Sequence, residues 1–286
     1  RQALVGHSAS GKTSLAEALL YKTGAIDKKG RVEEGSTVSD YEAQEKKRGI
    51  SIQTSIIPVE YEDYKINFID SPGFFDFEGE VLQALRASEA ALFVIDGENG
   101  IEVGTEKYWN YTQEINLPSI IFVNKLDKEN AHFNKVVSDL HIEFGKKVIP
   151  LTLMLGEGDE FEGVIDVLDK KAYTYENGEK KEVEIPEIRL AEVDAVYEEI
   201  IEAVAETDDS LMEKFFEGEK FSESEFRKGL TEAILNGTVV PLIAGSSEKE
   251  IGLTQLLEVI TRYMPSIDDE VAHIGFRVKD LSLIHI

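Results

Sequence analysis

The sequence has 286 residues, 56 acidic against 30 basic side chains, a formal net charge of −26 at pH 7 and no cysteine. A chain of this length can form one large domain or two, and the lack of cysteine excludes a disulfide framework and suits a reducing compartment. No apolar stretch approaches the ~20 residues that span a bilayer, and so acidic a chain does not attract nucleic acid through its overall charge. We therefore expect a cytoplasmic protein with no membrane and no DNA partner.

The acidic side chains are concentrated in one part of the chain. Residues 157–232 hold 25 acidic and nine basic side chains, whereas residues 1–150 hold 24 and 17. This contrast predicts a separate acidic module, although a solvated surface accounts for most of these charges.

The first element with a chemical signature is the octapeptide GHSASGKT at residues 6–13. It follows the apolar run 3–5 and precedes residues 14–20, which have helical spacing, so it matches the strand–loop–helix context of a phosphate-binding loop. The glycines let successive backbone N–H groups point at phosphate oxygens, Lys12 is expected to reach the β- and γ-phosphates, and Thr13 is the expected Mg²⁺ ligand. A plain glycine-rich turn is the alternative. The predicted nucleotide ligands here are Gly6, His7, Ser8, Ala9, Ser10, Gly11, Lys12 and Thr13.

A long polar stretch over residues 26–49 is predicted to be a loop, and a loop of this length is usually either functional or disordered. It leads into strands expected over residues 50–61 and 64–69, and the second strand ends in Asp70-Ser71-Pro72-Gly73. At the end of a strand that follows a phosphate loop, D-x-x-G is typical of a nucleotidase. Asp70 is then the second residue that faces the metal ion, and the Gly73 N–H is expected to contact the γ-phosphate.

The next pairs of elements are a helix over 78–88 with a strand over 90–95, and a helix over 102–115 with a strand over 119–123. The last strand ends in Asn124-Lys125-Leu126-Asp127. The Asp127 carboxylate can accept hydrogen bonds from both N1–H and the exocyclic amino group of guanine, an arrangement that adenine lacks. Asn124 is expected to tie this segment to the phosphate loop, and the stem of Lys125 to lie along the purine. These residues predict a guanine nucleotide.

The alternation continues with a helix over 131–145 and a strand over 147–153, and it favours a doubly wound, mainly parallel α/β sheet with ligand loops at the strand ends. The pattern breaks at paired short strands, 163–167 and 172–175, and at three acidic helices, 188–205, 209–216 and 223–236. A strand over 239–243 then resumes the sheet and delivers Gly245, Ser246 and Ser247, whose N–H groups are placed to meet the guanine O6. A helix over 252–263 closes the domain.

We therefore predict the P-loop GTPase fold with an inserted α+β subdomain. The expected boundaries are 1–156 and 237–264 for the nucleotide-binding core, 157–236 for the acidic insertion, and 265–286 for a linker with the start of a truncated β-barrel domain.

Together these residues resemble the G domain of the translational GTPases, and among them elongation factor G and its paralogues. The resemblance rests on five motifs: residues 6–13, Arg48-Gly49-Ile50-Ser51, residues 70–73, residues 124–127 and residues 245–247. It implies GTP or GDP with Mg²⁺, GTPase activity, and Thr13, Ser51 and Asp70 as metal ligands. It also implies a β-barrel strand near residues 271–279 and a ribosomal partner, with rRNA and the stalk protein contacted through the acidic insertion. We expect a monomer.

Three positions depart from the elongation factor G pattern. Phe74 stands where that family has the histidine that positions the attacking water, and a phenyl ring can neither donate nor accept a hydrogen bond. Ala9 replaces an aspartate of the phosphate loop, and Ser51 replaces a threonine. The first two changes resemble a divergent bacterial class of elongation-factor-G-like proteins. The expected catalytic positions are Lys12, Gly73 and Phe74, which stands at the usual histidine position. Because these changes remove polar groups near the γ-phosphate, GTP binding is better supported than fast hydrolysis.

Competing interpretations follow from the same residues. Phe74 favours a GTP-dependent ribosome-binding switch that does not hydrolyse GTP, and a ribosomal protection or release GTPase shares this domain. An ATP-using P-loop kinase is disfavoured by residues 124–127. On the helix 188–205, the acidic residues, Glu198 and Glu202 among them, fall largely off the apolar stripe, which indicates either a wet helix face or a surface that recruits the basic stalk protein.

Overall fold

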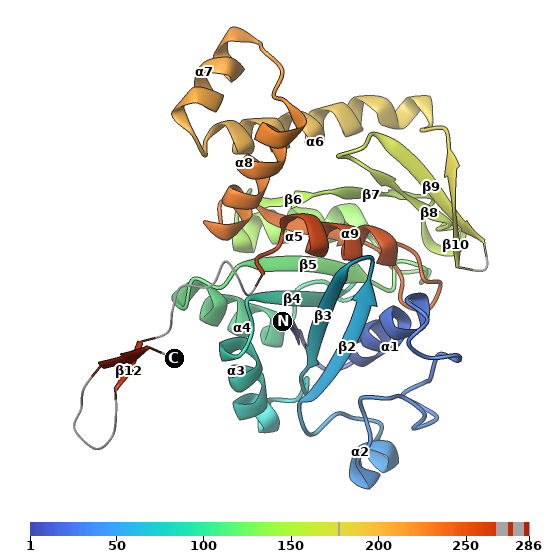
Figure 1. Ribbon diagram of the computed structural model, residues 1–286. Helices are drawn as coiled ribbons and strands as arrows, with labels where there is room; N and C mark the ends of the chain where they lie inside the picture. Colours follow the sequence, from blue (N-terminus) through green and yellow to red (C-terminus); the bar gives the residue numbers. More distant parts are fainter. Residues whose placement is uncertain (177, 267–273, 277–282, 286) are drawn as a thin grey trace.

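A computed structural model describes residues 1–176, 178–266, 274–276 and 283–285 (Figure 1). Of the expected barrel strand at 271–279, the described part is β12 (Ile274–Phe276), which pairs antiparallel with β13 (Leu283–His285). The other residues of that expected strand, and residues 281, 282 and 286, lie outside the described ranges.

A seven-stranded sheet forms the centre of the chain and confirms the predicted α/β class. Its order is β2 (Ser55–Tyr61), β3 (Tyr64–Asp70), β1 (Gln2–Val5), β4 (Ala90–Asp96), β5 (Ser119–Asn124), β11 (Val240–Ala244) and β6 (Val148–Pro150). β2 runs antiparallel to β3, whereas the other neighbours are parallel. Every residue of β4 and β5 is buried, as expected for parallel strands covered on both faces.

Six helices belong to this core: α1 (Lys12–Lys22), α2 (Ala43–Arg48), α3 (Glu78–Arg86), α4 (Val103–Glu114), α5 (Phe133–Phe144) and α9 (Leu253–Tyr263). α1 packs against α9, and the Trp109 ring of α4 stacks on Phe144 of α5 with ring centroids 4.2 Å apart. Among the helices of the described residues, none combines the length and apolarity needed to cross a membrane.

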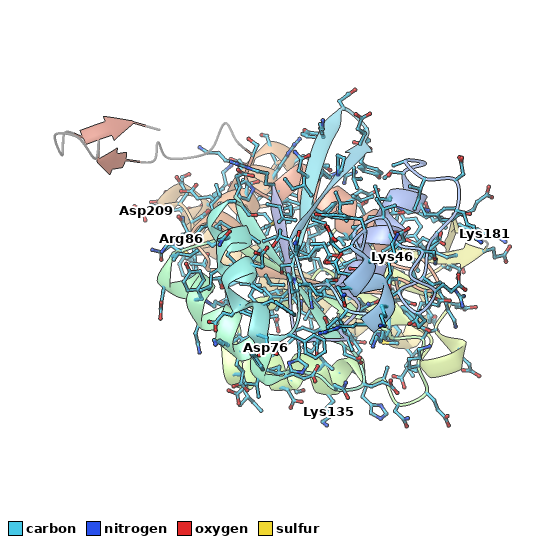
Figure 2. All side chains as sticks on the ribbon, turned by 90° about the horizontal axis from the view of Figure 1, so that it is seen from below. Lys46, Asp76, Arg86, Lys135, Lys181 and Asp209 are labelled. Carbon is cyan, nitrogen blue, oxygen red and sulfur yellow. The ribbon has the colours of Figure 1, made fainter. Side chains whose placement is uncertain are left out.

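The second unit of the chain is a four-stranded antiparallel sheet with three helices. Its strands are ordered β10 (Glu179–Val183), β9 (Lys171–Glu176), β8 (Gly163–Asp166) and β7 (Thr152–Leu155), and its helices are α6 (Glu187–Ala205), α7 (Asp209–Glu217) and α8 (Glu223–Leu235). α6 lies above this sheet at the top of Figure 1, whereas α2 lies at the bottom. Figure 2 shows Lys181 of β10 and Asp209 of α7 at opposite sides of the molecule, so the unit spans its width.

The strand expected over residues 147–153 is two strands in two different sheets. β6 pairs with β11 in the seven-stranded sheet, whereas β7 pairs with β8 in the four-stranded sheet. The chain changes sheet at Leu151, whose N–H donates to the Leu242 carbonyl and whose carbonyl accepts from the Val167 N–H. The second sheet thus begins at Thr152, before the expected boundary at residue 157. A continuous apolar run cannot reveal such a change of sheet, because both halves are buried.

Two of the elements that were not predicted are β10 and α2. β10 has mostly charged residues because it is an exposed edge strand, where charge discourages pairing with other chains. α2 lies within the expected loop 26–49, and a capping box between Glu42 and Glu45 begins it while Gly49 ends it in the left-handed conformation. That E-x-x-E spacing followed by glycine is the signal that could have located the helix.

The strand expected from residue 50 begins at Ser55. The preceding backbone is bonded to carboxylates instead: Glu45 Oε1 accepts from the N–H groups of Ile52 and Gln53 at 2.9 and 3.1 Å, and Glu80 accepts from Thr54 at 3.0 Å. The other predicted helices and strands of the described residues end close to their predicted bounds.

Asp166 is a buried carboxyl at the end of β8. Its Oδ1 accepts from the N–H groups of Leu168 and Asp169 at 3.0 and 3.1 Å. Burial raises the pKa of Asp166 to about 6. The charges of Asp169 and Glu258 act in the same direction, and the hydrogen bond from Asp169 and the charge of Lys180 oppose them.

Because the pKa of Asp166 is higher in the folded chain than its ordinary value of 3.8, protonation favours folding, and its contribution to stability grows as the pH falls through about 6. Asp166→Asn keeps an Oδ1 acceptor and removes this dependence. We expect the free energy of unfolding, measured by urea titration, to rise by about 1 kcal/mol more in the wild type than in the variant when the pH is lowered from about 7.5 to about 5. Asp63→Asn, in the exposed β2–β3 turn, is the control. Identical pH slopes for wild type and Asp166→Asn would contradict the prediction.

Candidate functional site

The loop between β1 and α1 has the backbone shape that a phosphate cradle requires. Gly6, Ala9 and Gly11 have φ angles of 150°, 63° and 94°. A Cβ on Gly6 would lie 2.4 Å from the Val94 carbonyl oxygen, and a Cβ on Gly11 would lie 2.3 Å from Asn124 Nδ2. Both positions therefore require glycine for space as well as for conformation.

Lys12 is buried, and its ammonium group lies within the curve of this loop. Nζ donates to the carbonyls of Gly6 at 3.0 Å and His7 at 2.9 Å. Burial lowers the pKa of Lys12 to about 8, against the opposing charges of Asp70 and Glu102. A phosphate group beside Nζ would supply the counter-charge that burial removes.

The D-x-x-G turn packs directly on the phosphate loop. A Cβ on Gly73 would lie 2.6 Å from Ser8 Cα and 2.7 Å from Lys12 Nζ, so glycine alone fits there. Asp70, at the end of β3, accepts from Thr13 Oγ1 through Oδ2 at 2.8 Å, and Thr13 Oγ1 lies 3.1 Å from Ser51 Oγ.

Thr13, Ser51 and Asp70 therefore form one cluster of oxygen atoms. The second carboxylate oxygen of Asp70, Oδ1, is buried and has no hydrogen-bond partner within the described residues. Burial raises the pKa of Asp70 to about 6, opposed by the Thr13 hydrogen bond and the Lys12 charge. Hydroxyl and carboxylate oxygens suit Mg²⁺. A cluster of three or more His, Cys, Asp or Glu side chains placed to hold a metal is not found in the described residues.

The side chain of Asn124, at the end of β5, joins two loops that are distant in sequence. Nδ2 donates to the Ser10 carbonyl of the phosphate loop at 3.1 Å, and Oδ1 accepts from the Ser247 N–H of the β11–α9 loop at 2.9 Å. Lys125, with φ 61°, donates to the Ala9 carbonyl and to Asp96 Oδ2, both at 2.7 Å. The phosphate loop is therefore held from the side of β5.

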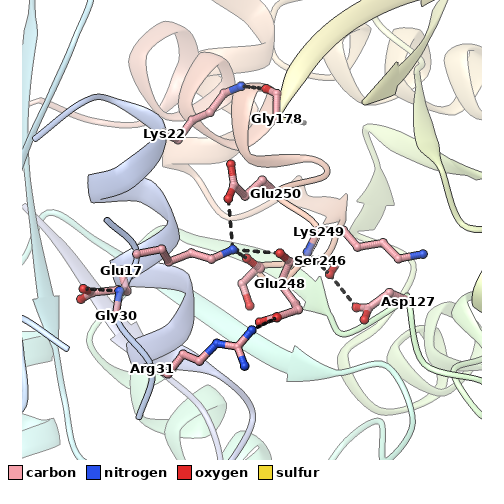
Figure 3. Close-up of polar contacts among 12 residues, drawn as sticks. Glu17, Lys22, Gly30, Arg31, Asp127, Gly178, Ser246, Glu248, Lys249 and Glu250 are labelled. Atoms are coloured by element: carbon pink, nitrogen blue, oxygen red, sulfur yellow. Dashed lines mark hydrogen bonds and ion pairs between the residues drawn. The ribbon is translucent and has the colours of Figure 1, made fainter. Parts of the chain in front are cut away.

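Asp127, which follows β5, is bonded to the β11–α9 loop. Asp127 Oδ1 accepts from Ser246 Oγ at 2.5 Å, and Ser246 Oγ accepts from the Lys249 N–H at 3.0 Å (Figure 3). A Cβ on Gly245 would lie 2.4 Å from Phe122 Cζ, so this loop too requires glycine.

Nine of the predicted residues line one pocket of about 300 Å³. Its walls include Ser8, Ala9, Gly11, Lys12, Thr13, Ser51, Gly73, Phe74 and Lys125. A neighbouring pocket of about 240 Å³ shares Ser14, Val32 and Glu33 with it and reaches Ser247. The His7 side chain is placed elsewhere, with its ring 6.0 Å from that of Phe75 and Nε2 3.5 Å from Glu102.

The elongation factor Tu GTP binding domain family matches residues 1–266 of the sequence. The chain belongs to this family. An elongation factor Tu GTP binding domain is a GTP-binding module of translation factors, and the family is one of GTPases, in agreement with the motifs assembled around the pocket.

A crystal structure from Thermus thermophilus is similar to this GTP binding domain. The two share 41% sequence identity with a TM-score of 0.88, over 93% of this chain and 40% of the Thermus chain. The chain thus spans less than half the length of that relative.

Asp40 and Glu17 are two of the buried carboxylates of this GTP binding domain that were missed from the sequence. Asp40 accepts from Ser51 Oγ at 2.7 Å and from Thr37 Oγ1 at 3.3 Å, and burial raises its pKa against the Ser51 hydrogen bond. Glu17 accepts from the N–H groups of Gly30 at 3.0 Å and Val38 at 2.9 Å, which fixes the loop after α1. A lone carboxylate in the apolar stretch 15–20 was the available signal for Glu17, whereas Asp40 lies in a polar loop without one.

Asn124→Ala removes the amide that joins the two loops. We expect the free energy of unfolding, measured with urea and no nucleotide, to fall by about 2 to 4 kcal/mol, because Ser10 and Ser247 each lose a buried partner. Asn134→Ala, on the exposed side of α5, should change it by less than about 0.5 kcal/mol. A similarly small change for Asn124→Ala would show that the amide does not hold these loops.

Proposed function

We propose that this chain is the GTP-binding domain of a translation factor resembling elongation factor G, and that it couples GTP binding and hydrolysis to a ribosomal step such as translocation. The observation that supports the proposal is the hydrogen-bonded connection between two kinds of group. Lys12 and Thr13 line one pocket and Thr13 is bonded to Asp70, whereas Ser246, which is bonded to Asp127, belongs to the loop that Asn124 joins to the phosphate loop.

The roles follow from the atoms that each residue offers. The backbone N–H groups of the phosphate loop and the Lys12 ammonium suit the β- and γ-phosphates of GTP, and the Gly73 N–H suits the γ-phosphate. The Asp127 carboxylate suits the N1–H and amino group of guanine. Ser246 orients that carboxylate by donating to Oδ1, and Lys128 Nζ lies 3.7 Å from Oδ2, so each oxygen keeps a lone pair that can accept from the base.

A Mg²⁺ ion fits the oxygen cluster, because the unpartnered Oδ1 of Asp70 belongs to the carboxylate whose other oxygen already meets the Thr13 hydroxyl beside Ser51. Thr13, Ser51 and Asp70 would hold the ion, and Asp40 would orient Ser51. When bound, Mg²⁺ supplies positive charge to the β- and γ-phosphate oxygens.

A ribosomal partner is proposed on family membership and on the charge of the second unit. On α6, Glu198, Glu199 and Glu202 are exposed, whereas Val193 and Ile200 are buried. An exposed acidic face suits a basic patch on the ribosomal stalk protein and would act mainly on the rate of association. We also propose that the protein acts as a monomer in the cytoplasm.

Phe74 favours a second candidate function, a GTP-dependent switch without turnover of its own. Its side chain is 41% exposed and forms part of the pocket wall next to Gly73. A phenyl ring in this position cannot orient a water molecule by hydrogen bonding. Hydrolysis would then need backbone groups of this chain and charge supplied by the ribosome.

Asp127→Asn tests the assignment of guanine. We expect GDP binding to weaken about 10- to 100-fold and xanthosine diphosphate binding to strengthen, because the amide replaces an acceptor with a donor that matches the xanthine 2-carbonyl. Affinities for both nucleotides, measured by calorimetry, decide the question. Glu129→Gln is the matched control. An unchanged preference for GDP in Asp127→Asn would remove the guanine assignment.

Single-turnover GTP hydrolysis tests coupling to the ribosome. The protein to use is the Thermus relative with its matching segment replaced by residues 1–266 of this chain. We expect ribosomes to raise the hydrolysis rate on the order of 100-fold or more, because they would supply the charge and positioning that this chain lacks.

Phe74→His serves as the comparison in that assay and Phe75→His, at an equally exposed neighbouring ring, as its control. Stimulation of the unsubstituted protein supports a GTPase that tolerates Phe74. Stimulation restricted to Phe74→His would support the non-hydrolysing switch instead.

A further inference from the structure

Lys29 makes three hydrogen bonds across the opening of the proposed nucleotide cleft. Its Nζ donates to the carbonyl oxygens of Ser247 at 3.2 Å and Glu248 at 2.8 Å, and to Glu250 Oε1 at 3.1 Å. A lysine ammonium has three N–H donors, so all of them are used. The side chains of Lys29 and Glu250 are 20% and 14% exposed, which leaves this pair less screened by water than a surface ion pair.

These bonds join two walls of the cleft. Lys29 belongs to the loop after α1, which Glu17 fixes through the N–H groups of Gly30 and Val38. Its acceptors belong to the β11–α9 loop, which also carries the Ser246 hydroxyl bonded to Asp127 (Figure 3). Lys29 and Ser247 both line the pocket of about 240 Å³ that continues the phosphate pocket toward the base-recognition residues.

Glu250 has a backbone conformation that indicates a requirement for its side chain. Its φ angle is 59°, in the left-handed region that costs a non-glycine residue energy unless its surroundings offset it. Its carboxylate lies between Lys29 and the β9–β10 hairpin, because a Cβ on Gly178 would lie 2.9 Å from Oε2. Lys22 of α1 donates to the Gly178 carbonyl at 2.5 Å and closes the same junction (Figure 3).

We infer that Lys29 and Glu250 form a latch that slows the release of bound nucleotide. This inference rests on the proposed binding of guanine nucleotides. The latch closes the side of the cleft between the loop after α1 and the β11–α9 loop, so a nucleotide that leaves by this side requires the three hydrogen bonds to break. Lys29 and Glu250 are positioning residues. They hold the two walls together and leave the phosphate chemistry to Lys12, Thr13 and Asp70.

The latch also touches the second unit of the chain. Gly178 belongs to the β9–β10 connection, and its carbonyl and the Glu250 carboxylate are held at one junction by Lys22 and Lys29. A partner that moves this hairpin would act on Glu250 and thereby on nucleotide release. The acidic unit would then control exchange in addition to any role in recruitment.

The dissociation rate of a fluorescent N-methylanthraniloyl GDP, chased with excess GDP, tests the latch. We expect Lys29→Met to raise this rate about ten-fold, because charge-assisted bonds are lost. Glu250→Gln should raise it less, since Lys29 keeps its two carbonyl acceptors. The double variant should release nucleotide no faster than Lys29→Met alone, because both substitutions remove the same contact. Lys28→Met, at the exposed neighbouring position, is the matched control and should release GDP at the wild-type rate.

The outcomes separate this inference from the proposed function. A wild-type chain that does not bind the fluorescent GDP would refute nucleotide binding itself. A wild type that binds it, with equal release rates for Lys29→Met and Lys28→Met, would overturn the latch. Urea unfolding without nucleotide should change little in Glu250→Gln, which keeps the shape of the side chain, so this variant decides the question if Lys29→Met fails to fold.

Discussion

The buried amide of Asn124 is the interaction on which the geometry of the cleft depends. A single planar group donates to the phosphate loop and accepts from the β11–α9 loop, so it sets the distance between the two ends of the proposed ligand. Aspartate could not donate and leucine could do neither, so at this buried position the chemistry of the amide is specific. Lys125 strengthens the same connection through its left-handed backbone and its bond to Ala9.

The phosphate end of the cleft combines two buried groups of opposite charge. Burial lowers the pKa of Lys12 and raises that of Asp70, so in both the charged form is disfavoured, and the attraction between them offsets part of that cost. A triphosphate with its cation would add a negative group beside Lys12 and a positive one beside Asp70. Ser51 contacts Thr13 and donates to Asp40, and both Ser51 and Asp40 belong to the segment that precedes β2. The same cluster of polar groups therefore holds that segment in place.

The sequence predicted the core of the fold because alternating buried strands and amphipathic helices leave a strong period. It also predicted that Asn124 ties its segment to the phosphate loop and that Thr13 and Asp70 lie on the same side of the site, because their motifs have fixed spacing. Contacts that leave no local pattern in the sequence could not be predicted. Lys29 and Glu250 meet across most of the chain's length, and the change of sheet at Leu151 depends on which neighbour each half finds. Their partners are set by tertiary packing, which no short motif records.

The position of β6 at the outer edge of the seven-stranded sheet has a consequence for solubility. β11, which carries the loop with Ser246 and Ser247, is uncharged and wholly buried, and β6 occupies its otherwise open side. β6 is a strand of the core sheet that shields this edge, and it leads directly into β7, the first strand of the second unit. A chain shortened by the whole of residues 147–238 would present an apolar strand with unpaired backbone groups, the template on which sheets aggregate. A deletion of the acidic unit must therefore begin after β6 if the core is to keep this protection.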